Sequence, residues 1–340
     1  MLRVTIAGAG VVGLSIALGL AERGVRVTVL DPAPLGLNAS AVAAGMLAPV
    51  SESISEPSLD QLDLMMAARD HWPDLAARLG INLDRSGAVG VFSPERLALT
   101  EQTIKRLGIA GERLTASQLQ KVLPGVVPGE ACGISIADDW RIDVGLTLIA
   151  LRGRCLELGV EVERRAATEA EAGHPLVLAT GASDGFRDRA PELSSVAPIK
   201  GQIAHLALPN LITRVVRTEG AYLVPTGDGL LVGATMEVGR SDLEPDTTEM
   251  APIFAAAARL FPQIGDHEHR VRVGVRASTP DGLPLCGPAG QAGLFLAVGA
   301  RRNGWLLAPL LARIMVAYLM NEDPGPLARL FEPSRFQRSA

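Results

Sequence analysis

The first residues that could do chemistry are three glycines spaced to hold a phosphate. The sequence GAGVVG at residues 8–13 directly follows a short apolar segment, and Asp31 ends the next one. Gly8 permits a tight turn, Gly10 lets the backbone approach a pyrophosphate, and Gly13 lets a helix pack closely on a strand. Asp31 is placed to accept hydrogen bonds from a ribose, and its charge disfavours a 2′-phosphate. The pattern predicts a dinucleotide site that does not take NADP.

A parallel sheet is needed to position these residues. Residues 2–7 and 25–30 are predicted to be strands, with a helix over 12–23 between them, and residues 59–79 are predicted to form one further helix. Two later apolar strands, 176–182 and 294–298, also lead into glycine-containing turns. The carboxyl ends of parallel strands meet at one edge of a sheet, so we expect both turns to lie beside the first glycine loop.

A second group of strands, which includes 199–208, 221–224 and 230–234, is typical of an antiparallel sheet. The sequence therefore predicts an α/β chain with a discontinuous Rossmann-like dinucleotide-binding domain. An α+β substrate domain, built on the antiparallel sheet, is inserted into it. The predicted division gives 1–80, 140–198 and 270–340 to the first domain, and 81–139 and 199–269 to the second.

Composition excludes several functions. The chain has 340 residues, a formal net charge of −5 without a basic block, and 4% aromatic residues, so no nucleic-acid partner is expected. Three scattered cysteines form no CxxC motif and suit a reducing cytoplasm. His267 and His269 have no third ligand nearby, so no metal site is expected. No membrane span is expected either, because 4–21 holds the motif glycines and 306–320 is short and contains Arg313.

Further motifs extend over nearly the whole chain. They are AAGMLAP at 43–49, LATGA at 178–182, PIKGQ at 198–202, GATM at 233–236 and RNGWLLAP at 302–309. With GAGVVG and Asp31, they resemble the FAD-dependent amine and amino-acid oxidases of the D-amino-acid oxidase superfamily. AAGMLAP, GATM and the RNG segment resemble the glycine oxidase branch, which serves thiamine biosynthesis.

The resemblance implies bound FAD. Gly274 stands where relatives with covalent flavin have a cysteine, so the cofactor is expected to be non-covalent. The cofactor-binding residues predicted from the motifs and the resemblance are Gly8, Gly10, Val11, Val12, Gly13, Asp31, Pro32, Ala39, Ser40, Ala44, Gly45, Met46, Thr168, Gly181, Ala300, Arg301, Arg302, Asn303, Gly304, Trp305 and Leu306. The substrate residues that it implies are Arg276, Arg302, Tyr222 and Met236.

Side-chain chemistry is consistent with these roles. A guanidinium fork such as that of Arg276 can bind a carboxylate through two parallel hydrogen bonds, which Lys cannot do; a structural surface ion pair is the alternative. Tyr222 could donate a second bond, or could be a half-buried strand aromatic with its hydroxyl in water. Arg302 precedes a predicted helix, whose positive N-terminus would stabilise a reduced flavin. Arg301 competes with Arg302, but only Arg302 falls on the R-N-G pattern.

The implied reaction is oxidative deamination of glycine or another small amino acid or amine. A hydride passes from Cα to flavin, O2 is reduced to H2O2, and water hydrolyses the imine to a 2-oxo acid and ammonia. No protein acid or base is expected to be obligatory, because the flavin carries the chemistry. Two alternatives are a dehydrogenase that passes electrons to a carrier and a non-catalytic flavoprotein. The resemblance also makes a homo-oligomer, and a thiazole synthase as partner, expectations.

Overall fold

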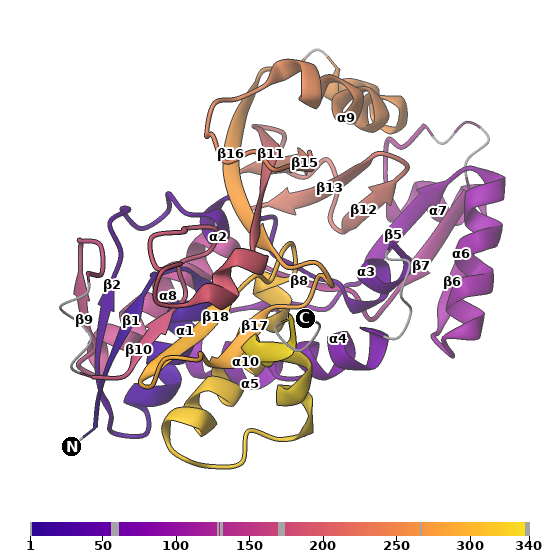
Figure 1. The fold of residues 1–340 in the computed structure, drawn as a ribbon. Helices are drawn as coiled ribbons and strands as arrows, with labels where there is room; N and C mark the ends of the chain where they lie inside the picture. The colour runs from indigo at the N-terminus through magenta and orange to yellow at the C-terminus, as the bar shows by residue number, and fades with distance from the viewer. Residues whose placement is uncertain are drawn as a thin grey trace.

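The structure is a computed structural model and describes residues 2–55, 61–127, 129, 132–168, 174–265 and 267–336. Its elements form two large sheets and one small one (Figure 1). The first sheet has the order β17-β18-β10-β1-β2-β9. The bounds of its strands are β1 (Arg3–Ala7), β2 (Arg26–Leu30), β9 (Glu161–Glu163), β10 (Leu176–Leu178), β17 (Leu285–Pro288) and β18 (Leu294–Val298).

This six-stranded sheet is parallel except at one edge, where β17 pairs antiparallel with β18. β10 pairs parallel with β1 on one side and with β18 on the other. The turns that follow these three strands therefore lie at the same edge of the sheet, as predicted. The central strand β10 is apolar throughout because both of its faces are covered: Val177 packs into one core, while its neighbours Leu176 and Leu178 pack into another on the opposite face.

Helices α1 (Val11–Ala21), α8 (Val144–Glu157) and α10 (Gly304–Leu319) contribute to the larger of these cores. Also in it are α4 (Leu62–Arg69) and α5 (Trp72–Leu79), which the sequence predicted as one helix over 59–79. The structure divides that stretch at Asp70 and His71, and residues 59 and 60 lie outside the described part. The Trp72 indole nitrogen donates to the carbonyl oxygens of Trp305 and Leu306, at 3.1 and 3.3 Å. The division thus orients α5 toward the start of α10.

The second sheet has nine strands in the order β15-β11-β14-β13-β12-β5-β7-β6, with β16 paired to β11. Helix α9 (Thr247–Leu260) packs on it, and α6 (Pro94–Arg106) and α7 (Ala116–Val122) flank its far end (Figure 1). The bounds of its strands are β5 (Ala88–Phe92), β6 (Gly111–Leu114), β7 (Cys132–Ile136), β11 (Ala197–Leu206), β12 (Val215–Thr218), β13 (Ala221–Thr226), β14 (Gly229–Gly233), β15 (Glu237–Val238) and β16 (His269–Ser278).

The longest pairing in this sheet joins β11 to β16, in antiparallel register from Ala197–Ser278 to Leu206–His269. β16, orange in Figure 1, runs from the α9 end of the sheet towards the first sheet. The predicted division placed residues 270–278 in the dinucleotide-binding domain, whereas their hydrogen bonds lie in the nine-stranded sheet. We retain the division into two domains as a proposal, with this strand assigned to the second.

Short elements link the two large sheets. β3 (Met46–Leu47), β8 (Trp140–Ile142) and β4 (Leu83–Asp84) form the three-stranded sheet, and α2 (Ala39–Val42) and α3 (Pro49–Ser55) flank β3 in sequence. Four 3-10 helices complete the secondary structure of the described residues: Pro191–Ser195, Pro262–Ile264, Pro326–Phe331 and Pro333–Phe336. The α/β fold class with a Rossmann-like domain, predicted from the sequence, is confirmed. The second sheet is antiparallel as predicted except where β12 pairs parallel with β5. None of the helices described here is long and apolar enough to cross a membrane.

Gly13 tests the packing at the start of α1. A Cβ on Gly13 would lie 2.0 Å from the Gly8 carbonyl oxygen, whereas a Cβ on Gly153 of α8 would meet no heavy atom within 4 Å. We expect Gly13→Ala to destabilise the protein by about 1–3 kcal/mol through overpacking. Gly153→Ala should stabilise it by about 0.5–1 kcal/mol, because alanine loses less entropy in a helix. Urea unfolding of both variants measures the two changes, and equal stability of Gly13→Ala and the wild type would contradict this packing.

Candidate functional site

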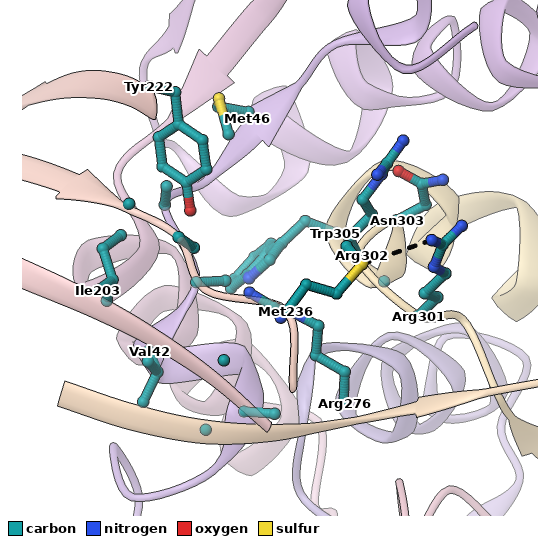
Figure 2. A pocket seen from close by; sticks show the side chains of 18 of the residues that line it. Val42, Met46, Ile203, Tyr222, Met236, Arg276, Arg301, Arg302, Asn303 and Trp305 are labelled. Atoms are coloured by element: carbon teal, nitrogen blue, oxygen red, sulfur yellow. Dashed lines mark hydrogen bonds between the residues drawn. The ribbon is translucent and has the colours of Figure 1, made fainter. Parts of the chain in front are cut away.

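The site is a cavity of about 470 Å³ enclosed by segments that are far apart in sequence. Its walls come from the start of α1, from α2 to α3, from β11, from β12 to the segment that follows β14, from β16, and from the loop that enters α10. Figure 2 shows the side chains that these elements direct into it. The predicted residues that line the cavity are Val11, Ala39, Ser40, Ala44, Gly45, Met46, Tyr222, Met236, Arg276, Arg301, Arg302, Asn303, Gly304 and Trp305.

The other predicted cofactor residues lie outside this lining. They are Gly8, Gly10, Val12, Gly13, Asp31, Pro32, Thr168, Gly181, Ala300 and Leu306. Several of them build the glycine loop or support it from behind. Leu306 is buried in the core, whereas Gly181 and Thr168 are exposed. Their cofactor roles stay predictions.

The glycine loop is held in place by its neighbours. A Cβ on Gly8, which has φ of +113°, would lie 2.3 Å from the Ala179 carbonyl oxygen at the end of β10. Asp31 accepts hydrogen bonds from the backbone N–H of Ala9 at 2.7 Å and of Ala33 at 2.8 Å. The carboxylate therefore fixes the loop against the end of β2. Each of its oxygens has a second lone pair, so the predicted ribose contact is compatible with these bonds.

Two helix N-termini meet at the cavity. The backbone N–H of Val11, the first residue of α1, donates to the Ser40 hydroxyl at 3.0 Å. The Trp305 indole nitrogen, in the first turn of α10, donates to the Ser40 carbonyl oxygen at 2.9 Å. Asn303, the N-cap of α10, makes no side-chain capping bond, and no acidic residue occupies the first turn. This end of α10 thus presents its positive dipole to the cavity.

Arg276 extends from β16 into the cavity through a gap left by a glycine. A Cβ on Gly201, the cross-strand neighbour of Gly274, would lie 2.2 Å from Arg276 Nη1. Nη1 donates to the Thr235 carbonyl oxygen at 3.1 Å. Burial lowers the pKa of Arg276, because the charged form loses hydration. The guanidinium is therefore a desolvated cation that faces the cavity (Figure 2) and can bind an anion there.

Tyr222 lies on the neighbouring wall. A Cβ on Gly233, its cross-strand partner, would lie 2.9 Å from the Tyr222 hydroxyl oxygen. Burial raises the pKa of this hydroxyl, although the charges of Arg276 and Arg217 act in the opposite direction. The hydroxyl is therefore protonated at neutral pH and can donate a hydrogen bond.

Glu52 is a site residue that the sequence analysis missed. It is 8% exposed, lies on α3, and lines the cavity. Its Oε1 lies 3.2 Å from Arg217 Nη2, and its Oε2 accepts a hydrogen bond from Arg302 Nε. Burial alone would raise the pKa of Glu52, but the two arginines outweigh that effect and lower it. The carboxylate is therefore ionised at neutral pH.

Arg217, on β12, is a second site residue that was not predicted from the sequence. It lines the cavity and contacts Glu52 across 165 residues of sequence, so no local spacing connects the two. The acidic and serine-rich run at residues 51–56 is the only sequence signal near Glu52, and it is equally typical of a solvated loop. An ion pair between residues so far apart in sequence can be recognised only in the three-dimensional structure.

A second buried carboxylate holds the helix that carries Glu52. Asp139 accepts hydrogen bonds from the backbone N–H of Val50 at 2.9 Å and of Ser51 at 3.2 Å. These are free N–H groups of the first turn of α3, so Asp139 acts as its cap from a distant segment. Burial raises the pKa of Asp139, and the backbone bonds and Arg217 partly offset that rise.

Arg301 and Met236 lie at a more exposed part of the cavity. The Arg301 Nη2 contacts the Met236 sulfur at 3.5 Å (Figure 2), and the Met236 side chain is 42% exposed. Arg301 has φ of +49°, which marks the tight turn into α10. Arg302, the next residue, turns instead to Glu52. The sequence analysis preferred Arg302 over Arg301 as a substrate ligand; the structure places both at the cavity, with Arg302 already paired to a carboxylate.

Comparisons with known proteins converge on one family. The model of a family described as FAD dependent oxidoreductase (DAO) matches residues 3–318. The chain is 31% identical to the bifunctional protein ThiO/ThiG of Synechocystis sp., with 98% of this chain and 54% of that protein covered. It is 28% identical to a glycine oxidase of Pseudomonas aeruginosa, with 95% and 96% covered. The chain thus spans about half the length of the bifunctional relative.

The fold agrees with a solved structure. The glycine oxidase from Geobacillus kaustophilus superposes with a TM-score of 0.84, at 27% identity over 98% of this chain and 99% of that one. The fold of this chain is therefore an architecture that is known in a glycine oxidase.

Gly201 tests the placement of Arg276. In Gly201→Ala, the new Cβ would collide with the guanidinium, so the arginine must leave its position. We expect binding of acetate, a simple carboxylate, to weaken by at least tenfold in isothermal titration calorimetry. The control is Gly227→Ala, because a Cβ at Gly227, in the turn after β13, would meet no heavy atom within 4 Å. Equal acetate affinity of the two variants would show that Arg276 does not bind the carboxylate from this position.

Proposed function

Because the chain belongs to the DAO family of FAD-dependent oxidoreductases, we propose that it catalyses oxidative deamination of glycine or another small amino acid or amine. The observation that carries this proposal is the partly buried guanidinium of Arg276 in a cavity that also receives the N-terminus of α10. The products would be a 2-oxo acid, ammonia and hydrogen peroxide, with oxygen as the electron acceptor.

The residues present fit FAD. Val11, the first residue of α1, lines the cavity, so a phosphate bound there would lie at the N-terminus of that helix. A Cβ at Gly10 would already lie 3.1 Å from the Ser40 hydroxyl oxygen, so a larger residue would crowd this approach. Asp31 lies at the end of β2, where a ribose would bind. We assign the pyrophosphate to the loop at 8–13 and the flavin end to the residues around Ser40, Gly45 and Asn303–Trp305. When bound, FAD supplies the acceptor for a hydride and returns two electrons to oxygen.

The protein's own contribution is to bind and orient the substrate. Arg276 would bind the carboxylate by its fork, and the protonated Tyr222 hydroxyl would donate a further bond. A carboxylate held there neutralises a cation that has lost its hydration, so the interaction is strong. Met236, at the exposed part of the cavity, would cover the bound molecule.

The positive end of α10 would stabilise negative charge near it. The first turn of the helix carries no acid, so the dipole acts without local compensation. Arg302 is next to this turn but is neutralised by Glu52. The helix end therefore provides an electrostatic contribution that does not depend on a mobile side chain.

A partner follows from the relatives as a further proposal. The matched bifunctional protein named ThiO/ThiG is nearly twice as long as the region that this chain covers. We propose that a protein or domain equivalent to the uncovered half, as the expected thiazole synthase would be, is the functional partner of this chain. We also retain a cytoplasmic location and a homo-oligomer as proposals.

The reaction is tested by adding glycine, sarcosine and other small amines to the purified FAD-containing protein. We expect anaerobic loss of the oxidised flavin absorbance, and release of peroxide in air. Reduction of an artificial electron acceptor without oxygen uptake would indicate a dehydrogenase instead. Absence of flavin reduction by every amine tested would contradict an enzymatic role and favour a non-catalytic flavoprotein.

Substitution of Arg276 tests the carboxylate assignment. We expect Arg276→Ala to weaken substrate binding by about 3–5 kcal/mol, because the substrate carboxylate would be buried without a partner. Arg276→Lys should lie between this variant and the wild type, since lysine keeps the charge but lacks the fork. Steady-state kinetics with the best amine measures both, and FAD content serves as the folding control. Unchanged kcat/KM in Arg276→Ala would place the carboxylate elsewhere.

A further inference from the structure

The cavity has more positive charge than a monocarboxylate needs. Four arginines line it, Arg217, Arg276, Arg301 and Arg302, against one acid, Glu52, within the described residues. A zwitterionic amino acid brings one carboxylate, which Arg276 can bind. Glu52 is the carboxylate that pairs with Arg217 and Arg302, and without it a ligand carboxylate could take its place.

The side-chain carboxylate of Glu52 itself takes the place of such an anion. One carboxylate oxygen faces Arg217 and the other accepts from Arg302. Glu52 thus holds these two guanidinium groups as the second carboxylate of a dianionic ligand would. The match is incomplete, because the buried Arg217 Nε has no hydrogen-bond partner. Arg217 therefore keeps an unused donor beside the carboxylate.

Glu52 and the Arg276 site share one space. The charges of Arg276, Arg217 and Glu52 all act on the pKa of the Tyr222 hydroxyl. All four residues line the cavity. A ligand carboxylate bound to Arg276 therefore lies within the field of Glu52. A second carboxylate on the same ligand would meet a fixed negative charge, and the arginines that could accept it are already engaged.

We propose that Glu52 is a specificity-determining residue that restricts this site to substrates with a single carboxylate. It holds Arg217 and Arg302 and repels a second acidic group, so dicarboxylic amines are excluded. This inference rests on the proposed function for the chemistry of the substrate. The binding selectivity that it describes can be measured without turnover, so it is tested separately from the reaction.

The test compares Glu52→Gln with the wild type. Gln keeps the shape of the side chain but removes its charge, so Arg217 and Arg302 lose their ion pairs with Glu52. The probes are acetate and malonate, titrated into the FAD-containing protein and followed by the flavin absorbance change and by calorimetry. We expect the affinity for malonate relative to acetate to rise by at least tenfold. The control is Glu322→Gln, which removes an exposed acid paired with Arg23 far from the cavity lining and should leave the ratio unchanged.

A second substitution separates a specific site from a general charge effect. The double variant Glu52→Gln/Arg217→Met also removes the Arg217 guanidinium. The increase in the logarithm of the malonate-to-acetate affinity ratio should then be at most half of that in Glu52→Gln. If Glu52→Gln does not fold, Glu52→Ala replaces it. Alanine also removes the charge and cannot reach either arginine, so it should shift the ratio in the same direction. A malonate-to-acetate ratio within threefold of the wild type in the folded variant overturns the proposal.

Catalysis provides an independent measurement. Glu52→Gln should raise kcat/KM for iminodiacetate, which has two carboxylates, relative to sarcosine, which has one. If no amine reduces the flavin but the malonate ratio shifts, the proposed reaction fails and the role of Glu52 stands. If amines are oxidised but the ratio does not move, the reaction stands and the role of Glu52 is wrong.

Discussion

The functional site depends on the compensation of buried positive charge. Arginine side chains that leave water need a partner, since an isolated buried cation is far more costly than a paired one. The structure meets this need in two ways. Glu52 pairs with Arg217 and Arg302, whereas Arg276 receives one carbonyl oxygen from Thr235. The difference leaves Arg276 as the cation whose charge a ligand can neutralise.

This charge arrangement requires both sheets. Glu52 belongs to α3, which Asp139 caps; Arg217 belongs to the nine-stranded sheet, and Arg302 to the loop after β18. Arg276 reaches the cavity because β16 pairs with β11 along ten residues of each strand, which sets its side chain over Gly201. The ion pairs thus link the sheets at the cavity, and the geometry of the site is inseparable from how the sheets are held together.

Local patterns in the sequence predicted much of the scaffold. The glycine loop, the strands on either side of it and α10 follow from short-range spacing and apolar runs. Arg276, Tyr222 and Met236 were predicted from motifs, and the structure places all three in the cavity lining. Glu52 and Arg217 were not predicted, because an ion pair across 165 residues leaves no periodic signal. The break between α4 and α5 was also missed, since its cause is a contact between Trp72 and α10.

The same distinction explains two kinds of glycine in this chain. Gly8 has a positive φ and a sequence motif, so its role was visible in advance. Gly201 has no such backbone requirement, and its role is to leave room for a guanidinium that comes from a strand seventy-five residues later. A local motif can specify a turn, but it cannot specify an empty volume whose occupant is distant in sequence. The parts of the site that discriminate between ligands are built from such distant pairings, so they are the parts for which the three-dimensional structure is indispensable.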